Sequence, residues 1–122
     1  MILHILSKEE WLATQDKGVY TPLTLDNDGF IHCSTPEQVV AVANSLFQGQ
    51  TGLVLLCIDP SKVSADVVFE DLYNLGSMFP HIYGPLNLDA VVRIMEFPPK
   101  KDGNFELPQE INAHSLAPTD IQ

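Results

Sequence analysis

The sequence predicts a single α+β domain with small, mainly antiparallel or mixed sheets. With 122 residues, 45% of them hydrophobic, the chain is long enough for one compact core and too short for two ordinary domains. Five or six short segments have the length of strands, and two segments in the N-terminal half have helical signals. Because these segments do not alternate regularly, a doubly wound parallel fold is disfavoured. We expect the globular unit to span residues 1–110 and the polar stretch 111–122 to be a loose tail.

The first segments predict a strand followed by a helix. Residues 2–6 are apolar and end at Ser7, and residues 7–10 have the pattern of a capping box. Gly18 is expected to end the helix. Residues 19–28 contain a proline, an asparagine and several acids, so we expect them to form a surface loop.

A second helix is expected after a short strand over residues 30–33. Thr35 is the predicted N-cap, Pro36 occupies the first helical position, and Gln38 completes a capping box. Gly49 should end the helix. Its apolar residues recur at spacings of three and four, as expected for a face that packs on a sheet: Val39, Val40, Val42, Ala43, Leu46 and Phe47.

The remaining segments predict strands and one tight turn. Residues 53–58 are apolar without alternation, which indicates the central strand of the sheet. Residues 67–70 and 90–97 predict two further strands. Residues 101–104 have the pattern of a hairpin turn leading to residues 105–107.

Charge and composition exclude several classes of function. The formal net charge is −10 and the chain has only six lysines and arginines, so its surface is poorly suited to DNA or RNA, although a single nucleotide in a neutral pocket is compatible with it. No apolar run approaches the roughly 20 residues of a membrane-spanning helix, so we expect no membrane association. Cys33 and Cys57 lie in apolar segments, which favours buried reduced thiols and a cytoplasmic location.

Residues 28–35 and 79–86 have the character of a site. If residues 30–34 are extended, Phe30, His32 and Ser34 share one face. The step from Ser34 to Thr35 leads into a helix N-terminus, where free amides favour an anion such as a phosphate. A purely structural role is equally compatible: Ser34 or Thr35 caps the helix, and His32 is a hydrogen-bonded core histidine.

Three further residues are candidates for the same site. His81 and Tyr83 also share a face if their segment is extended, although Pro80 and Gly84 suggest a rigid, irregular backbone or a stiffened turn. His4 shares a face with apolar neighbours, a pattern more typical of a satisfied core histidine than of a ligand. Glu70 ends an apolar strand, where a carboxylate usually faces solvent or pairs with a cation.

Metal binding and cysteine chemistry have little support in the sequence. The histidines and cysteines have no CxxC, HxH or HExxH spacing, so no metal is expected. His32 and Cys33 are adjacent and therefore point to opposite faces of a strand, which disfavours a cysteine nucleophile.

Several motifs together resemble a known family. They are ILHI (residues 2–5), EW (10–11), DGFIHCST (28–35), QV (38–39), VAN (42–44), FE (69–70) and FPHIYGPL (79–86). The sequence resembles the bacterial family called domain of unknown function 952, over roughly residues 1–98. Members of that family are similar to the ADP-ribosyltransferase fold, in which two small packed sheets form a cleft that holds NAD.

This resemblance implies roles for individual residues. His4 matches the first-strand residue that contacts the adenosine-side ribose, and His32, with Ser34 and Thr35, matches the second-strand element beside the nicotinamide. Glu70 is the expected stabiliser of the ribosyl cation, although it falls earlier than the usual transferase glutamate. Glu96 lies on a later predicted strand but has no motif around it.

The leading hypothesis is therefore a cleft for NAD or a related nucleotide, with Glu70, His32 and His81 as catalytic residues. His4, Ser34, Thr35 and Tyr83 are the expected cofactor-binding residues. The main alternative is a non-catalytic module that binds a small ligand. An RNA 2′-phosphotransferase needs arginines, of which the chain has one, and a metal-assisted hydrolase would use His4, His32 and His81.

Overall fold

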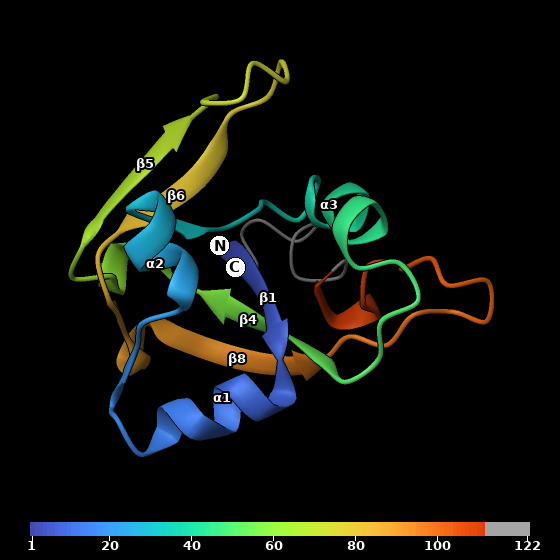
Figure 1. Cartoon of the computed structure of the whole chain (residues 1–122), viewed down its shortest axis with the longest axis horizontal. Coiled ribbons are helices and arrows are strands. Elements are labelled where there is room, and N and C mark those ends of the chain that lie inside the picture. The colour runs from blue at the N-terminus through green and yellow to red at the C-terminus, as the bar shows by residue number, and fades with distance from the viewer. Residues whose placement is uncertain (112–122) are drawn as a thin grey trace, which may run out of the picture.

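The computed structural model describes residues 1–111, which form three small antiparallel sheets (Figure 1). The first sheet has the order β1-β4-β8, made of Ile2–Ser7, Leu53–Ile58 and Val91–Glu96. The second has the order β3-β6-β5, made of Ile31–His32, Phe79–Tyr83 and Asp66–Glu70. A ribbon joins β2 (Val19–Tyr20) to β7 (Leu86–Asn87). The α+β class is confirmed, with three sheets among the described residues where the family resemblance implied two.

Strand β4 is the centre of the fold, as its uninterrupted apolar run predicted. All six of its residues are buried, and alternate side chains enter two core clusters on opposite faces of the sheet. The first cluster lies between this sheet and the other two, and includes Leu56, Tyr20 and Ile82. The second lies against α3 (Val39–Leu46) and includes Leu55. An apolar strand without alternation is thus explained by burial on both faces.

Strand β1 connects the two larger sheets. One edge of β1 pairs with β4 along its whole length. On the other edge Leu3 and Ser34 exchange two backbone hydrogen bonds of 2.7 and 2.8 Å, which attach the segment after β3. This bridge is confined to Leu3, and residues 3–7 of β1 line the cavity described below.

The predicted cap of the first helix is confirmed. Helix α1 comprises Lys8–Gln15, and the Ser7 hydroxyl accepts a hydrogen bond of 3.0 Å from the Glu10 amide. The helix ends at its C-cap Asp16, before Gly18 adopts a left-handed conformation with φ of 75°.

The prediction that residues 19–28 form a surface loop was wrong. They form β2 and then α2 (Leu23–Asp28), which Gly29 ends in a left-handed conformation. The reason lies far away in the sequence: Tyr20 pairs with Leu86 in the ribbon and is almost completely buried. A two-residue strand whose partner is so remote carries no local periodicity.

Helix α3 begins later than predicted. Its first residue is Val39, because Thr35 and Gln38 form a hydrogen-bonded turn before it. The Thr35 amide donates to the Gln38 side-chain oxygen over 3.0 Å, and the Gln38 amide donates to the Thr35 carbonyl over 3.0 Å. The hydrogen bond from the Thr35 amide to the Gln38 side chain, expected of a capping box, therefore forms. It closes a turn that precedes the helix rather than the first turn of the helix.

A hairpin of β5 and β6 extends away from the first sheet, with its connecting loop, residues 71–78, at the outer end (Figure 1). Asp71 organises this loop by accepting hydrogen bonds of 2.8 Å from the amides of Leu75 and Gly76. Gln38 donates to Ser77 and to the Met78 carbonyl, at 3.2 and 2.8 Å, and so ties the loop to the start of α3. Strand β6 is regular, contrary to the irregular backbone that Pro80 suggested.

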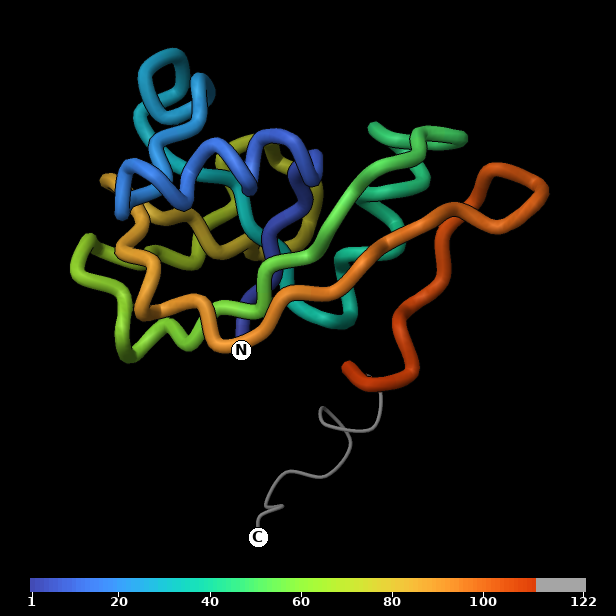
Figure 2. The backbone as a smooth tube through the Cα atoms, turned by 90° about the horizontal axis from the view of Figure 1, so that it is seen from below, coloured from blue at the N-terminus to red at the C-terminus, as the bar shows by residue number. Residues whose placement is uncertain are grey.

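The chain after β8 folds back on α3. Residues 101–103 form the predicted turn, closed by a 2.8 Å hydrogen bond from the Lys100 amide to the Asn104 carbonyl. Figure 2 shows this turn beside the segment after α3, where the Gly49 amide donates to the Gly103 carbonyl over 2.8 Å. No strand forms at residues 105–107, and Phe105 packs in the second cluster instead.

Two short 3-10 helices, η1 (Pro60–Lys62) and η2 (Leu88–Ala90), complete the elements. Ile111, the first residue of the predicted tail, is buried in the second cluster, and residues 112–122 of that tail lie outside the described residues. No helix within residues 1–111 is long and apolar enough to cross a membrane.

Candidate functional site

A cavity of about 670 Å³ lies beside the free edge of β1. Its walls come from β1, from the segments around β2 and β3, from α3 and from the 71–78 loop, and most of them are apolar. A volume of this size is typical of small-molecule sites. Its polar and ionisable lining residues are His4, Ser7, Glu10, Tyr20, Thr24, His32, Cys33, Ser34, Gln50, Glu70, Tyr73 and His81.

The pairing of β3 with β6 brings the two sequence runs together. His32 lies directly opposite His81 in the register, and their ring centroids are 5.7 Å apart. The Phe30 ring stacks on the His81 ring, with ring centroids 4.0 Å apart. Ile31 and Cys33 point into the first core cluster, so the predicted assignment of faces along this strand is confirmed.

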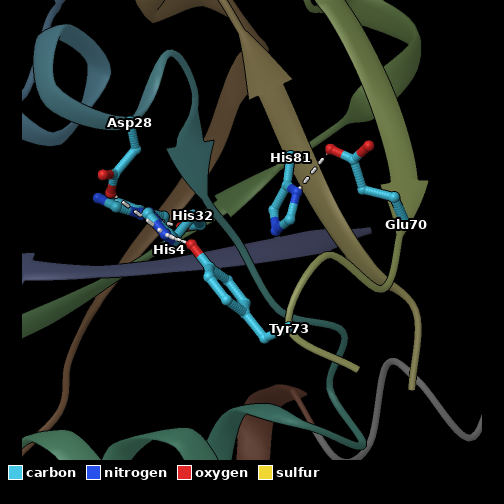
Figure 3. Close-up of polar contacts among 6 residues, drawn as sticks. All are labelled: His4, Asp28, His32, Glu70, Tyr73 and His81. Carbon is cyan, nitrogen blue, oxygen red and sulfur yellow. Dashed lines mark hydrogen bonds and ion pairs between the residues drawn. The ribbon is translucent and has the colours of Figure 1, made fainter. Parts of the chain in front are cut away.

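Glu70 is held by two hydrogen bonds to one of its oxygens. His81 Nδ1 lies 2.8 Å from Glu70 Oε2, and the Tyr83 hydroxyl donates to the same oxygen (Figure 3 shows the His81 contact). These bonds, first that from Tyr83 and then that from His81, hold the pKa of the Glu70 carboxyl below its usual range. The Glu70 side chain remains 22% exposed, at the wall of the cavity.

His4 is buried and has a partner at each ring nitrogen. Nδ1 lies 2.6 Å from the His32 carbonyl, which can only accept, so Nδ1 carries the proton. In the neutral ring Nε2 then accepts from the Tyr20 hydroxyl, 2.7 Å away. Burial lowers the pKa of His4 to about 4, and raises that of Tyr20, which keeps both groups neutral. The interpretation of His4 as a core histidine with both ring nitrogens hydrogen-bonded therefore fits its contacts.

His32 is more accessible and has different neighbours. Its Nε2 lies 3.3 Å from the Tyr73 hydroxyl and 3.6 Å from Asp28 Oδ2 (Figure 3). Burial lowers the pKa of His32, the charge of Asp28 opposes this shift, and His81 adds to it. The imidazole is thus available to the cavity as a neutral donor or acceptor near neutral pH.

The other predicted binding residues are less central. Ser34 is buried and lines the cavity, whereas Thr35 and Tyr83 are not among the lining residues. The predicted phosphate position at a helix N-terminus does not form, because α3 begins at Val39 and the amides of Thr35, Gln38 and Val39 already have partners within the turn. Tyr83 contacts Glu70 through its hydroxyl and the Phe30 ring through its own ring.

Two tyrosines that line the cavity, Tyr20 and Tyr73, were not predicted from the sequence. Tyr20 lies in a segment that we expected to be a loop, and no local pattern marks it. Tyr73 had a usable signal: Leu72, Tyr73 and Leu75 are large apolar residues in a segment rich in turn formers, which is unusual for a solvated loop.

The cysteines and metal ligands lie outside this chemistry. Burial raises the pKa of Cys33, and raises that of Cys57 to about 11 despite the nearby charge of Arg93, so both thiols are poor nucleophiles. Within residues 1–111 no group of three or more His, Cys, Asp or Glu side chains is arranged to hold a metal ion. A metal site built on three histidines also lacks its first ligand, because both ring nitrogens of His4 are engaged.

Residues 5–94 match the family described as "Protein of unknown function (DUF952)". The chain belongs to this family. The match includes both DUF952 segments that meet at His32 and His81. No curated protein matches the chain.

Two solved structures extend the DUF952 comparison to nearly the whole domain. The crystal structure of protein CC0527 from Caulobacter crescentus is 34% identical, with a TM-score of 0.82, and the match covers 91% of this chain and 97% of that one. The solution NMR structure of CC0527 is 32% identical over 89% and 94% of the two chains, with a TM-score of 0.70. The DUF952 chain is therefore similar to CC0527 in sequence and in fold.

Proposed function

We propose that the cavity binds NAD or a related nucleotide-like ligand, and that Glu70 promotes cleavage of the bond between nicotinamide and ribose. The domain would then act as an ADP-ribosyltransferase-like enzyme with water as acceptor. One observation carries the proposal: a carboxylate fixed by His81 and Tyr83 faces the same cavity as His32.

The chemistry requires a fixed negative charge. When the glycosidic C–N bond breaks, its electron pair leaves with nicotinamide and the ribose becomes an oxocarbenium ion. A preorganised carboxylate stabilises that cation more than it stabilises the substrate. Water then bonds to the ribosyl carbon and releases a proton to solvent. The lowered pKa of Glu70 keeps the carboxylate ionised for this role.

The neighbouring residues have separate roles in this proposal. Tyr83 is a positioning residue, because it holds Glu70 and does not line the cavity. His81 holds the same Glu70 oxygen and also lines the cavity. His32 and Ser34 line the cavity and offer hydrogen bonds to ribose hydroxyls. His4 contacts no ligand through its nitrogens, so it positions Tyr20 and the strand that carries His32.

A non-catalytic binding module is the second candidate. The observation in its favour is that both hydrogen bonds reach the same Glu70 oxygen, which disperses the negative charge that a ribosyl cation would need. Under this alternative the ligand binds in the same cavity and is released unchanged.

The decisive experiment compares Glu70→Gln with Glu96→Gln. Glu96 is an exposed glutamate on β8, 3.6 Å from Lys8 and outside the cavity, and is thus a matched control. Release of nicotinamide should fall by about 100-fold or more in Glu70→Gln, with ligand binding kept, and should be unchanged in Glu96→Gln. Binding without release in the unsubstituted protein contradicts the enzyme and supports the binding module.

A further inference from the structure

The charged side chains that line the cavity are all acidic or histidine. Glu10 on α1 and Glu70 on β5 are its two acidic lining residues. No lysine or arginine is among the lining residues. His4 and His32 do not compensate, because burial disfavours their charged forms. The cavity therefore has negative potential, on a chain of net charge −10.

The six basic residues of the whole sequence lie elsewhere. Lys8 pairs with Glu96 at 3.6 Å. Lys17 does not line the cavity but lines a smaller, neighbouring hollow of about 210 Å³, which shares Glu10 and Tyr20 with it. Arg93 is on β8, the opposite edge of the sheet from β1. Lys62 lies in η1, and the remaining two lysines lie at the 101–103 turn. Residues 112–122 contain no lysine or arginine.

This arrangement penalises phosphorylated ligands. A diphosphate would lose its hydration in an apolar cavity whose lining residues include no lysine or arginine to replace it. It would also lie near two carboxylates, whose repulsion is strongest where water is excluded. The carboxylates of Glu10 and Glu70 would instead attract a cation.

Aromatic rings in the cavity favour a planar cation. Tyr73 lies nearly parallel to His32, with ring centroids 6.4 Å apart and an interplanar angle of 10°. Tyr20 and Phe79 also line the cavity. A flat cationic ring gains from aromatic faces as well as from nearby carboxylates, and the gain rises when the site excludes water.

We infer that the ligand of this cavity is a phosphate-free nucleoside with a planar cationic base, for which nicotinamide riboside is the accessible representative. The inference rests on the proposed function and narrows its substrate class. In the reaction, the bond between ribose C1′ and the pyridinium nitrogen breaks and its electron pair neutralises the ring. The oxygen of water bonds to C1′, and one proton goes to solvent. The products are nicotinamide and ribose.

The first experiment measures binding by calorimetry and nicotinamide release by chromatography, for nicotinamide riboside and NAD in parallel. The expected result is that nicotinamide riboside exceeds NAD by about tenfold or more in affinity or in kcat/KM. Equal or better performance of NAD overturns the inference and leaves the proposed function standing. If neither compound binds or reacts, both are overturned.

A second experiment adds a cation at the rim. Leu72 lines the cavity and is 53% exposed, whereas Leu12 on α1 is 58% exposed and does not line it. Leu72→Lys should raise the affinity for NAD several-fold, lower that for nicotinamide riboside, and lose both effects at high salt. Leu12→Lys should do neither. An affinity for NAD that Leu72→Lys leaves unchanged contradicts the electrostatic argument.

Discussion

His32 and His81 lie directly opposite each other on β3 and β6, with ring centroids 5.7 Å apart. This single pairing places two runs that are about fifty residues apart in sequence on one wall of the cavity. Because Glu70 contacts His81 from the next strand, the wall continues across all three strands of the sheet. This wall of the cavity is therefore formed by the β3-β6-β5 sheet, whereas the 71–78 loop forms another part of the lining.

Replacing Tyr83 with Phe should raise the pKa of Glu70. The Tyr83 hydrogen bond is the main cause of the lowered carboxyl pKa, and it is also what raises the pKa of the Tyr83 hydroxyl. Carbon-13 NMR titration of the Glu70 carboxyl measures the change directly. Any activity that needs the ionised carboxylate should then be lost at a higher pH in Tyr83→Phe.

The matched control is Tyr73→Phe, which removes a hydroxyl that contacts His32 rather than Glu70. Its Glu70 titration should be close to that of the unsubstituted protein. An identical titration curve in Tyr83→Phe would show that Tyr83 does not hold the carboxylate.

The buried His4 should make the domain sensitive to mild acid. The unfolded chain binds a proton at the ordinary histidine pKa of 6.5, whereas folded His4 resists protonation until about pH 4. The contribution of His4 to the free energy of unfolding is therefore complete above pH 6.5 and falls as the pH drops towards 4. The free energy of unfolding, measured with urea, should fall by about 2 kcal/mol between about pH 7.5 and about pH 5 because of this residue alone.

His4→Asn separates this effect from other titrations. Asparagine keeps a donor near the position of Nδ1, towards the His32 carbonyl, but does not titrate. The variant should be less stable at neutral pH, because the Tyr20 hydroxyl loses its acceptor. Its loss of stability between the two pH values should nevertheless be smaller. An equal loss would assign the acid sensitivity to other groups.

Gln38→Ala should loosen the 71–78 loop. Gln38 is the side chain that ties Ser77 and the Met78 carbonyl to the turn before α3. Backbone amides of the loop should exchange hydrogen faster, while the free energy of unfolding changes by only about 1 kcal/mol. Gln48→Ala, which removes a single exposed contact to Asn104, should leave loop exchange unaltered. Unchanged exchange in both variants would mean that Asp71 alone orders the loop.

Both thiols should be inert in the folded protein. Cys33 and Cys57 are buried, and burial raises the pKa of each. A disulfide reagent such as Ellman's should react with neither at neutral pH and with both after urea unfolding. Rapid labelling of either cysteine in the native state would contradict the packing of β4 and of the segment after β3.

The sequence predicted the elements whose signals are local. The apolar run of β4, the Ser7 cap of α1 and the face of β3 that carries His32 were all correct, because each depends on neighbours within a few residues. Membership of the DUF952 family was also correctly inferred from the motifs.

What the sequence did not reveal depends on distant partners. Tyr20 is ordered by Leu86, and its hydroxyl is fixed by His4, so nothing near Tyr20 in the sequence indicates its burial. The start of α3 was misplaced because the Gln38 side chain serves the 71–78 loop as well as Thr35. Propensity rules do not include such competition for one side chain.

The long-range pairing around β1 has a kinetic consequence. β1 joins residues near the N-terminus to β4, about fifty positions later, and β8 must then pair with β4 before that sheet is complete. Closing such large loops costs chain entropy before the strand contacts can form and offset it. Chains rich in non-local strand pairs therefore fold slowly. The cavity should therefore be among the last features to appear as the chain folds, and a nascent chain that still lacks β8 would expose the apolar side chains of β4 to aggregation.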